Sequence, residues 1–242
     1  MRAAGFRGVA VREGLAAMIS VVIPTLNAQD VLGGALGALV GGAIGGLVKE
    51  VVVVDGGSTD HTRDIADAAG CRVLSSAPGR GTQMRTGAAQ ANAPWLLFLH
   101  ADTVPDADWI DEVGAFISAG RNDRAGVFRF ALAERGLWPR VFELMVGIRT
   151  RFAHLPYGDQ GLVISRTLYE AVGGYPDWPL FEDVDIVRRI GARRLHRFRT
   201  RAVTSGAKYV RDGWLRRAFH NQRLLWRFMA GADPKRLAEH YD

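Results

Sequence analysis

The sequence is poor in cysteine, with Cys71 as the single one among 242 residues. One thiol excludes an internal disulfide, and it excludes zinc and iron–sulfur sites that are built from several cysteines. This composition favours a reducing compartment. We therefore predict a cytoplasmic location, with a peripheral position at the inner face of the membrane as an option.

Long membrane-spanning runs are lacking as well. The uncharged stretch 31–48 has 18 residues, but seven of them are glycines. Each glycine costs about 1 kcal/mol of helix propensity relative to alanine, so this stretch favours a helix of a globular domain. The short apolar run 15–23 shows no clear cleavage site and is interpreted as a strand. Residues 1–17 are predicted to be a disordered extension, or to precede a true start at Met18, and have no assigned function.

Charge is distributed unevenly along the chain. Residues 193–242 contain 13 Lys/Arg and 4 Asp/Glu, whereas residues 1–192 contain 18 and 21. A basic end suits an anionic partner such as a phosphorylated substrate, nucleic acid or a membrane surface, although a solvated basic face gives the same count. Aromatic and arginine side chains interleave in the helix expected over 214–229, as in helices that lie on anionic bilayers. Packing of its aromatic side on the domain is the alternative, and we expect no nucleic-acid partner.

Hydrophobic patterning predicts one α/β domain over residues 18–242. Short β-branched runs alternate with helical patterns in the first half, which is typical of βαβ units and a parallel sheet. The strands expected there are 19–23, 50–54, 72–74 and 95–99, and the helices are 29–40, 59–69 and 81–92. The second half is less regular, with strands at 126–132 and 161–165 and helices at 108–119, 138–149, 166 onward, 182–190 and 214–229. We predict a Rossmann-like, mostly parallel sheet flanked by helices, with a basic C-terminal helical segment.

Polar residues follow three of the predicted strands, at 24–27, 55–60 and 100–103. Ligands of open parallel sheets bind beyond the carboxyl ends of the strands, so these residues are the first candidates for a site. Asp55 precedes two glycines at a strand end, where its carboxylate could accept hydrogen bonds from a nucleobase or ribose. An Asp turn or a helix cap is the alternative for Asp55.

Two further groups of side chains carry possible chemistry. His100 and Asp102 are two apart in an extended run, so both project the same way, roughly 6 to 7 Å apart. Asp102 could bind Mg²⁺ or Mn²⁺ together with phosphate oxygens, or it could cap the following turn. Glu182, Asp183 and Asp185 follow an aromatic and apolar segment, where burial would raise the proton affinity of a general base. Acids in the first turn of a helix, or surface pairs with arginine, are the alternative.

Four segments in this order resemble the family-2 glycosyltransferases with the GT-A fold: residues 20–27 (SVVIPTLN), 53–60 (VVDGGSTD), 99–103 (LHADT) and 182–183 (ED). The resemblance covers about residues 18–240. Residues 157–161, 172–176 and 204–205 are similar to a small bacterial subfamily whose members often sit near radical-enzyme or arsenosugar genes.

The resemblance implies an inverting transfer of a sugar from a nucleotide-diphosphate sugar to a hydroxyl of an unknown acceptor, with residues 18–107 binding the nucleotide and residues 108–242 the acceptor. It implies that Asp183 is the general base and that Asp102 binds a divalent cation, Mn²⁺ or Mg²⁺. The nucleotide would be held by Pro24, Thr25, Asn27, Asp55, Arg80, Gln83, Arg85 and His100. The sugar or acceptor would be faced by Asp159, Gln160 and Glu182.

One position departs from the family pattern. The metal motif of the family usually reads Asp-x-Asp, and here His100 stands at its first position. An imidazole can hydrogen-bond to ribose or phosphate, but it brings no negative charge for Mg²⁺.

Other functions are weaker matches to the sequence. A dehydrogenase would need a complete G-x-G-x-x-G after the first strand, and a sugar nucleotidyltransferase would need a glycine-rich loop there, but residues 24–27 read PTLN. A binding protein that uses its basic C-terminal helix on a membrane or nucleic acid, or another nucleotide-sugar-binding enzyme, is the remaining alternative. The transferase hypothesis requires Asp55, Asp102 and Asp183 to converge on one cavity.

Overall fold

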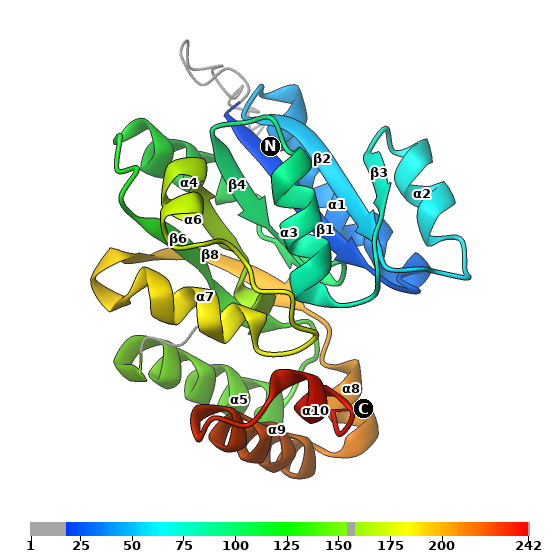
Figure 1. Cartoon of the computed structure of the whole chain (residues 1–242), viewed down its shortest axis with the longest axis vertical. Helices are drawn as coiled ribbons and strands as arrows, with labels where there is room; N and C mark the ends of the chain where they lie inside the picture. The colour runs from blue at the N-terminus through cyan, green and yellow to red at the C-terminus, as the bar shows by residue number, and fades with distance from the viewer. Residues whose placement is uncertain (1–17, 154–157, 242) are drawn as a thin grey trace, which may run out of the picture.

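The computed structural model describes residues 18–153 and 158–241 (Figure 1). The extension predicted for residues 1–17 lies outside the described residues. The eight strands are β1 (Ile19–Thr25), β2 (Val48–Asp55), β3 (Arg72–Ser75), β4 (Trp95–Phe98), β5 (Thr103–Pro105), β6 (Ala125–Leu132), β7 (Leu162–Ser165) and β8 (Leu195–Thr204). They form one sheet in the order β3-β2-β1-β4-β7-β6-β8-β5.

Helices cover the sheet and extend beyond it. They are α1 (Gln29–Ile44), α2 (Thr62–Ala68), α3 (Arg80–Gln90), α4 (Trp109–Ser118), α5 (Leu137–Ile148), α6 (Arg166–Ala171), α7 (Glu182–Ile190), α8 (Ala207–Asp212), α9 (Trp214–Met229) and α10 (Pro234–Ala238). Three short turns of other helix types are η1 (Arg149–Ala153), η2 (Gly158–Gln160) and η3 (Ala192–Arg194).

The sheet is parallel in its first half and mixed in its second. The pairs β3–β2, β2–β1 and β1–β4 are parallel, as expected of βαβ units. β7 then runs antiparallel between β4 and β6, whereas β8 is parallel to β6 and antiparallel to β5. The prediction of a mostly parallel sheet flanked by helices is therefore confirmed, with the antiparallel pairs confined to the half that follows β4.

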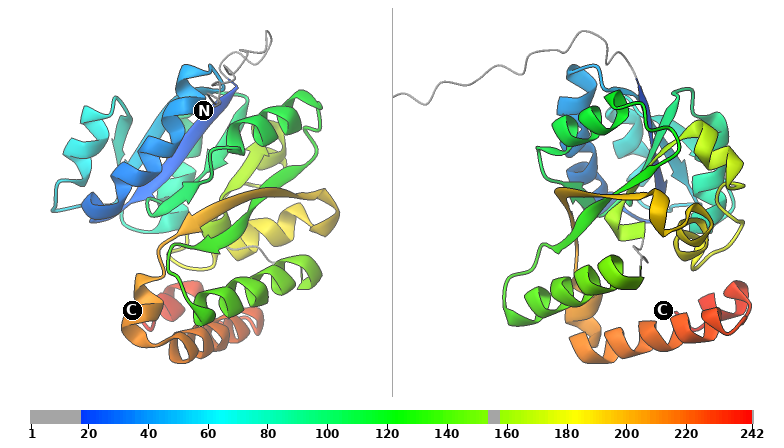
Figure 2. Two further views of the ribbon diagram at one scale, coloured as in Figure 1. Left: turned by 180° about the vertical axis from the view of Figure 1, so that it is seen from behind. Right: turned by 90° about the vertical axis from the view of Figure 1, so that its left-hand side faces the viewer.

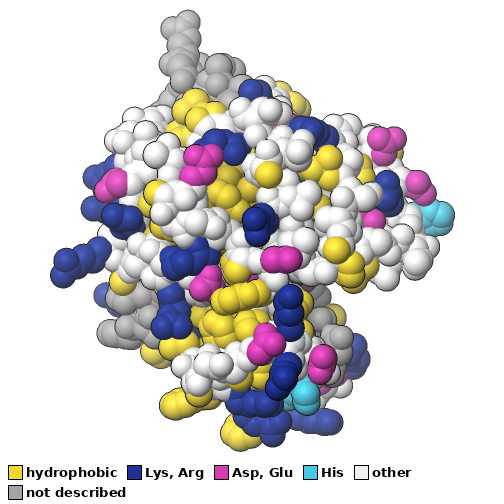
Figure 3. Space-filling view, in the orientation of Figure 1, with side chains coloured by type: hydrophobic (Ala, Val, Ile, Leu, Met, Phe, Trp, Pro, Cys, Tyr) yellow, Lys and Arg dark blue, Asp and Glu magenta, His cyan; other side chains and the backbone are white. Residues whose placement is uncertain are grey.

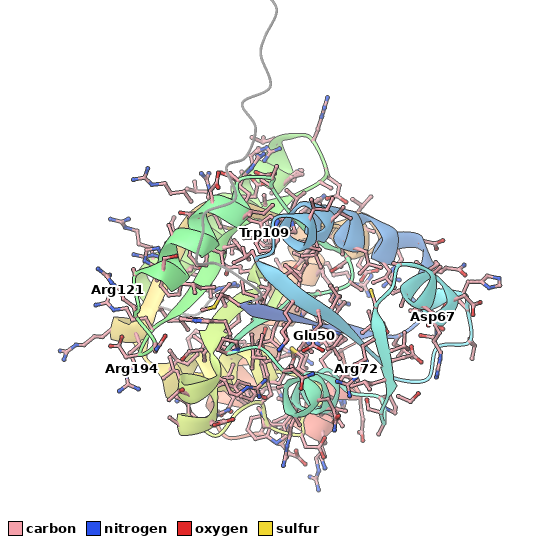
Figure 4. The ribbon with its side chains drawn as sticks, turned by 90° about the horizontal axis from the view of Figure 1, so that it is seen from above. Glu50, Asp67, Arg72, Trp109, Arg121 and Arg194 are labelled. Atoms are coloured by element: carbon pink, nitrogen blue, oxygen red, sulfur yellow. The ribbon has the colours of Figure 1, made fainter. Side chains whose placement is uncertain are left out.

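Alternate residues of the central strands bury into two separate cores. In β1, Val21 and Ile23 pack into a cluster beneath α1 and α4, whereas Val22 packs into a cluster beneath α3, α6 and α7. This alternation explains why the strand reads as a continuous apolar run, because both of its faces are covered. Figure 4 shows Trp109 beside α1, where its indole nitrogen donates to the Ala38 carbonyl at 3.1 Å.

Helices α5, α8, α9 and α10 gather at one end of the molecule, beyond the sheet (Figure 2). Phe142 of α5 packs against Tyr209 of α8 and Trp214 of α9, with ring centroids 4.6 and 6.0 Å apart. Leu224 and Leu225 of α9 join a small core with the start of α7. The predicted helical C-terminal segment is thus packed on the domain through one side of α9.

Two strands and two helices were absent from our sequence prediction: β5, β8, α8 and α10. The most consequential is β8, because residues 195–203 were predicted only to be part of the basic end of the chain. Phe198, Thr200, Ala202 and Thr204 are buried, while the arginines between them are exposed. This strict period of two is the signal of a strand with one buried face, and the arginines obscured it. Helix α2 also begins three residues later than predicted, at Thr62.

Candidate active site

A cavity of about 360 Å³ opens between the end of β4 and the helices gathered beyond the sheet. Its charged wall is built by the start of α3, the exit of β4, the η2 turn and the start of α7. These elements contribute Arg80, His100, Asp102, Asp159 and Asp183. The opposite wall comes from α8, α9 and the segment after α10, through Tyr209, Asn221, Leu224 and Tyr241. Five predicted site residues thus meet in one place.

The exit of β4 presents His100 and Asp102 to this cavity. β4 is buried on both faces and ends at Phe98, and the Thr103 amide then donates to the His100 carbonyl in a tight turn. Nε2 of His100 is buried and has no hydrogen-bond partner among the described residues. Burial lowers the pKa of His100, and the Arg80 charge lowers it further. The imidazole is therefore neutral near pH 7 and offers a nitrogen for a ligand.

The three carboxylates in the first turn of α7 lie in different environments. Glu182 is fully buried and pairs with Nε of Arg80 at 3.1 Å. Burial raises the pKa of Glu182 to about 7, although the Arg80 charge opposes this shift. Asp183 lines the cavity, and its Oδ1 accepts a hydrogen bond from the Val184 amide at 2.7 Å. Asp185 is held by Arg189 on the same helix, as the surface-pair alternative predicts.

Asp159 of the η2 turn completes the charged wall of the cavity. Burial raises the pKa of Asp159 to about 7, with the Arg149 charge opposing this and the Asp183 charge adding to it. Its Oδ1 is buried without a hydrogen-bond partner among the described residues. An unsatisfied carboxyl oxygen on a cavity wall is suited to contact a polar ligand.

Asp55 does not line this cavity. Its side chain is fully buried, and it accepts hydrogen bonds from the amides of Gly57 and Ser58 at 3.1 and 3.0 Å. The hydroxyls of Ser58 and Thr25 donate to its other oxygen. The expected convergence of three aspartates is therefore right for Asp102 and Asp183 and wrong for Asp55, because this carboxylate forms the Asp turn that was its alternative. The requirement for three converging aspartates was too strict, and the transferase hypothesis rests on Asp102 and Asp183.

The exits of β1 and β2 are joined to each other by hydrogen bonds. Oδ1 of Asn27, a residue with φ of 50°, accepts from the Thr59 amide at 2.9 Å. Nε2 of Gln83 donates to the carbonyls of Thr25 and Val54 at 2.7 and 2.8 Å. These contacts fix the edge of the sheet that was predicted to bind the nucleoside. Pro24 and Thr25, the last two residues of β1, belong to this edge.

Two other predicted residues face different hollows. Arg85 is exposed on α3 and lines a hollow with Tyr169 and Tyr175, because it lies on the side of the helix away from the cavity. Gln160 is buried, and its amide donates to the Phe128 carbonyl at 2.9 Å in the wall of a separate hollow. The structure does not bring either of them to the charged cavity.

The second wall of the cavity carries no motif that predicts it from the sequence. Tyr209, Asn221 and Tyr241 have no neighbouring motif, and they come from the basic C-terminal segment, for which the sequence predicted a helix but no part in the site. Helical periodicity offered one signal, because Asn221 is three and four residues from Leu224 and Leu225 and shares their inward face.

The family Glycosyl transferase family 2 matches residues 20–170, which include the exits of β1, β2 and β4 and the η2 turn. The chain belongs to this family. Family membership confirms the resemblance seen in the sequence, whereas the narrower subfamily remains a prediction.

Relatives of this family-2 protein include mycobacterial enzymes. The chain is 40% identical over 110 residues to a PGL/p-HBAD biosynthesis glycosyltransferase of Mycobacterium bovis, with 42% of each chain covered. It is 34% identical over 95 residues to a glucosyl-3-phosphoglycerate synthase of Mycolicibacterium paratuberculosis, which covers 36% of this chain and 29% of that one. The matches thus span less than half the length of these relatives.

Solved structures share the fold of this family-2 domain. The glucosyl-3-phosphoglycerate synthase of Mycobacterium tuberculosis, in complex with Mn²⁺, UDP and glucosyl-3-phosphoglycerate, aligns with a TM-score of 0.58 and 21% identity. The alignment covers 84% of this chain and 77% of that chain. At this identity the likeness establishes the GT-A fold.

The side chains of the family-2 cavity fit a divalent cation that is bound partly by the protein and partly by a substrate. No group of three His, Cys, Asp or Glu side chains in residues 18–153 and 158–241 could hold a metal by itself. Asp102 nevertheless supplies an anionic oxygen beside His100, whose Nε2 lacks a partner there. Mg²⁺ and similar cations are held by one or two carboxylates plus substrate phosphates, which agrees with this sparse set.

Among the helices that the structure describes, none is both long and apolar enough to cross a bilayer.

Proposed function

We propose that the protein is an inverting glycosyltransferase that moves a sugar from a nucleoside-diphosphate sugar to an acceptor hydroxyl. The observation that carries this proposal is the meeting of Arg80, His100, Asp102 and Asp183 around one cavity at the strand exits of a family-2 domain. Cationic, metal-binding and basic groups are the three kinds that this transfer requires.

The donor would lie along the exits of β1, β2 and β4. In this proposal the edge built from Pro24, Thr25, Asn27 and Asp55 holds the nucleoside, with Asp55 acting through the turn that it fixes. Arg80 reaches the cavity while Glu182 holds its guanidinium, so its charge is positioned for the diphosphate. A UDP-sugar is the first donor to test, because structures of the same fold bind UDP-glucose with Mn²⁺.

Asp102, with His100 beside it, would hold the divalent cation. Mn²⁺ bound there would supply positive charge to the departing diphosphate, as Mg²⁺ would. The neutral imidazole of His100 suits a hydrogen bond to a donor phosphate or a coordinate bond to Mn²⁺ better than to Mg²⁺.

Asp183 would take the proton of the acceptor hydroxyl. As the oxygen attacks the anomeric carbon, the bond from that carbon to the diphosphate breaks, and the proton passes to the carboxylate of Asp183. A single displacement of this kind inverts the configuration. Asp159 and Glu182 would help to shape the sugar and acceptor side, Asp159 directly and Glu182 through Arg80.

Replacement of Asp183 by asparagine tests the base. General-base help is worth about 10² to 10⁴ in rate, so Asp183→Asn should lose most turnover, measured as release of nucleoside diphosphate, while its affinity for the donor is kept. Asp185→Asn is the matched control, because Asp185 lies on the same helix and pairs with Arg189 instead of lining the cavity. Near-normal transfer by Asp183→Asn would refute the assignment, and a larger loss in Asp159→Asn would move the base to Asp159.

A thermal-shift panel of UDP-, GDP-, CDP- and dTDP-sugars tests donor and metal together. A ligand at 100 times its dissociation constant stabilises the protein by about 2.7 kcal/mol. We expect one base class to stabilise it, more strongly with Mn²⁺ than without, and Asp102→Asn to lose the Mn²⁺-dependent part. No shift with any donor would contradict the proposal. The acceptor, the subfamily and the cytoplasmic location remain predictions.

A further inference from the structure

The exposed apolar side chains of this protein are concentrated on three helices. Sixteen large hydrophobic residues are exposed in the described chain, and six lie on α5, one on α8 and four on α9, eleven in all. Those helices are the ones that gather beyond the sheet, and Figure 3 shows apolar and basic side chains together at that end of the molecule. A soluble surface scatters such residues singly, so a concentration of this kind indicates a binding face.

The exposed residues form a stripe on each of the two longer helices. At about 100° per residue, the exposed apolar residues of α9 fall within an arc of about 80°: Leu215, Phe219, Trp226 and Met229. The matching stripe of α5 consists of Leu137, Trp138, Val141, Leu144, Met145 and Ile148. The rings of Phe142, Tyr209 and Trp214 pack between the helices, so α5 and the start of α9 belong to one surface. We refer to these two stripes together with Val210 as the α5–α9 face.

Arginines border the apolar stripe of α9 along one flank. Arg216, Arg223 and Arg227 are exposed and occupy the next part of the helical circumference, within about 40° of arc. The helix contains no aspartate or glutamate. An apolar stripe with a basic flank matches the boundary between the acyl chains and anionic headgroups of a membrane, where arginines reach the phosphates.

A basic hollow lies at the same flank. It is lined by Asp212, Arg216, Arg217, Phe219, His220 and Arg223. Arg217 is only 5% exposed, and its Nη1 contacts Asp212 at 3.3 Å while its guanidinium stacks 4.7 Å from the Tyr241 ring centre. Its Nη2 is buried and has no hydrogen-bond partner among the described residues. A buried cationic donor without a partner, beside two more arginines, suits a phosphate group.

We propose that the α5–α9 face docks on an anionic lipid bilayer and that the hollow around Arg217 receives a lipid phosphate. The charge favours this partner over a second copy of the chain, because an apolar stripe bordered by exposed arginines would place like charges together across a symmetric dimer. The inward side of α9 contributes Asn221 and Leu224 to the candidate active site, so one helix would contact the membrane and the cavity. The docking itself does not depend on the proposed transfer reaction.

Vesicle flotation of the full chain tests the proposal. We expect binding to vesicles of phosphatidylcholine with phosphatidylglycerol, weaker binding to phosphatidylcholine alone, and a decrease as the salt concentration rises from about 0.05 to about 0.5 M. The double variant Phe219→Glu with Trp226→Glu should bind at least about tenfold more weakly, since it places two charges in the apolar stripe. The control is Val40→Glu with Ile44→Glu, two exposed apolar residues of α1 outside this face, which should bind like the wild type.

A second variant separates the basic flank from the apolar stripe. Arg216→Ser with Arg223→Ser should bind anionic vesicles about thirtyfold more weakly and neutral vesicles nearly as the wild type does, because each of the two arginines contributes about 1 kcal/mol near an anionic surface. Circular dichroism and thermal unfolding establish that each variant is folded. Failure of the folded wild type to float with anionic vesicles at low salt would overturn the proposal. So would sedimentation showing a dimer that Phe219→Glu with Trp226→Glu dissociates, without any vesicle binding.

Discussion

Two carboxyl groups beside the cavity, one on the fully buried Glu182 and one on the partly buried Asp159, retain their protons to near-neutral pH. The pKa of Asp159 and the pKa of Glu182 are both raised to about 7, in each case chiefly by burial. A carboxyl group with a raised pKa in the folded protein binds its proton more tightly there than in the unfolded chain. The free energy of unfolding therefore falls as the pH rises from the ordinary carboxyl value to about 7.

Asp159→Asn should reduce this pH dependence. The asparagine of the variant has no proton to lose, so between pH 4 and pH 8 the free energy of unfolding of the variant should rise by about 2 kcal/mol relative to that of the wild type. This is less than the full pKa shift gives, because Asp159 lines the cavity and is partly exposed. Urea unfolding at the two pH values measures the difference. The exposed Asp67→Asn serves as the control and should follow the wild type. Parallel curves for Asp159→Asn and the wild type would show that folding does not raise the pKa of Asp159.

His100 is the residue at which this chain departs from its family, and its replacement tests the cation site. His100→Asp adds a negative charge beside Asp102, so the dissociation constant of Mn²⁺ in the presence of UDP should fall about tenfold. Titration calorimetry measures it. His100→Asn adds no charge and should show no such gain. Equal affinity in His100→Asp and the wild type would place the cation away from this side chain.

At the scale of elements, α3 sits so close to the sheet that one glycine is required. A Cβ built on Gly87 would lie 2.3 Å from Cγ1 of Val22 and 3.0 Å from Cγ2 of Val54. These neighbours belong to rigid, buried strands, so the helix has to shift to admit even one methyl group. The start of α3, which carries Arg80 into the cavity, depends on that packing.

Gly87→Ala should therefore lower the free energy of unfolding by about 1 to 3 kcal/mol. Gly37→Ala is the matched control, because Gly37 lies in helix α1 and the added Cβ would meet no atom within 4 Å apart from its chain neighbours and the backbone of its own helix. The free energy of unfolding of the control should rise by about 0.5 to 1 kcal/mol, because alanine has a higher helix propensity than glycine. Denaturant unfolding compares the two, and a stable Gly87→Ala protein would mean that α3 can move away from β1 without cost.

At the scale of the whole molecule, α9 and the segment after α10 complete a cavity whose other wall belongs to the sheet. Asn221, Leu224 and Tyr241 face Arg80 and Asp183 across it. Binding of a nucleotide between the two walls should slow hydrogen exchange in α9 and α10, because opening of these helices would then require release of the ligand. Exchange measured by mass spectrometry with and without UDP and Mn²⁺ tests this. Unchanged exchange at saturating UDP would show that the nucleotide contacts the sheet side alone.

Local patterns were sufficient for much of the fold. β1, β2 and β4 are predicted by continuous apolar runs because both of their faces are covered, and the helices α1 and α3 follow from periodicity between them. The same patterns place His100 and Asp102 at a strand exit, and the parallel arrangement brings such exits to one edge of the sheet. The order of the motifs along the sequence also indicated the family to which the chain belongs.

The sequence by itself determined the elements of the nucleotide half and the residue types at their ends, because those depend on neighbours a few positions away. Tertiary structure alone decided which carboxylates share a cavity. Asp55 turns into its own loop, Glu182 binds Arg80, and Asp159 faces the cavity while the adjacent Gln160 faces away. Such outcomes depend on contacts between segments far apart in the chain, such as those of Arg80 and Glu182. No local period in the sequence shows which side of a strand or turn a distant segment will cover.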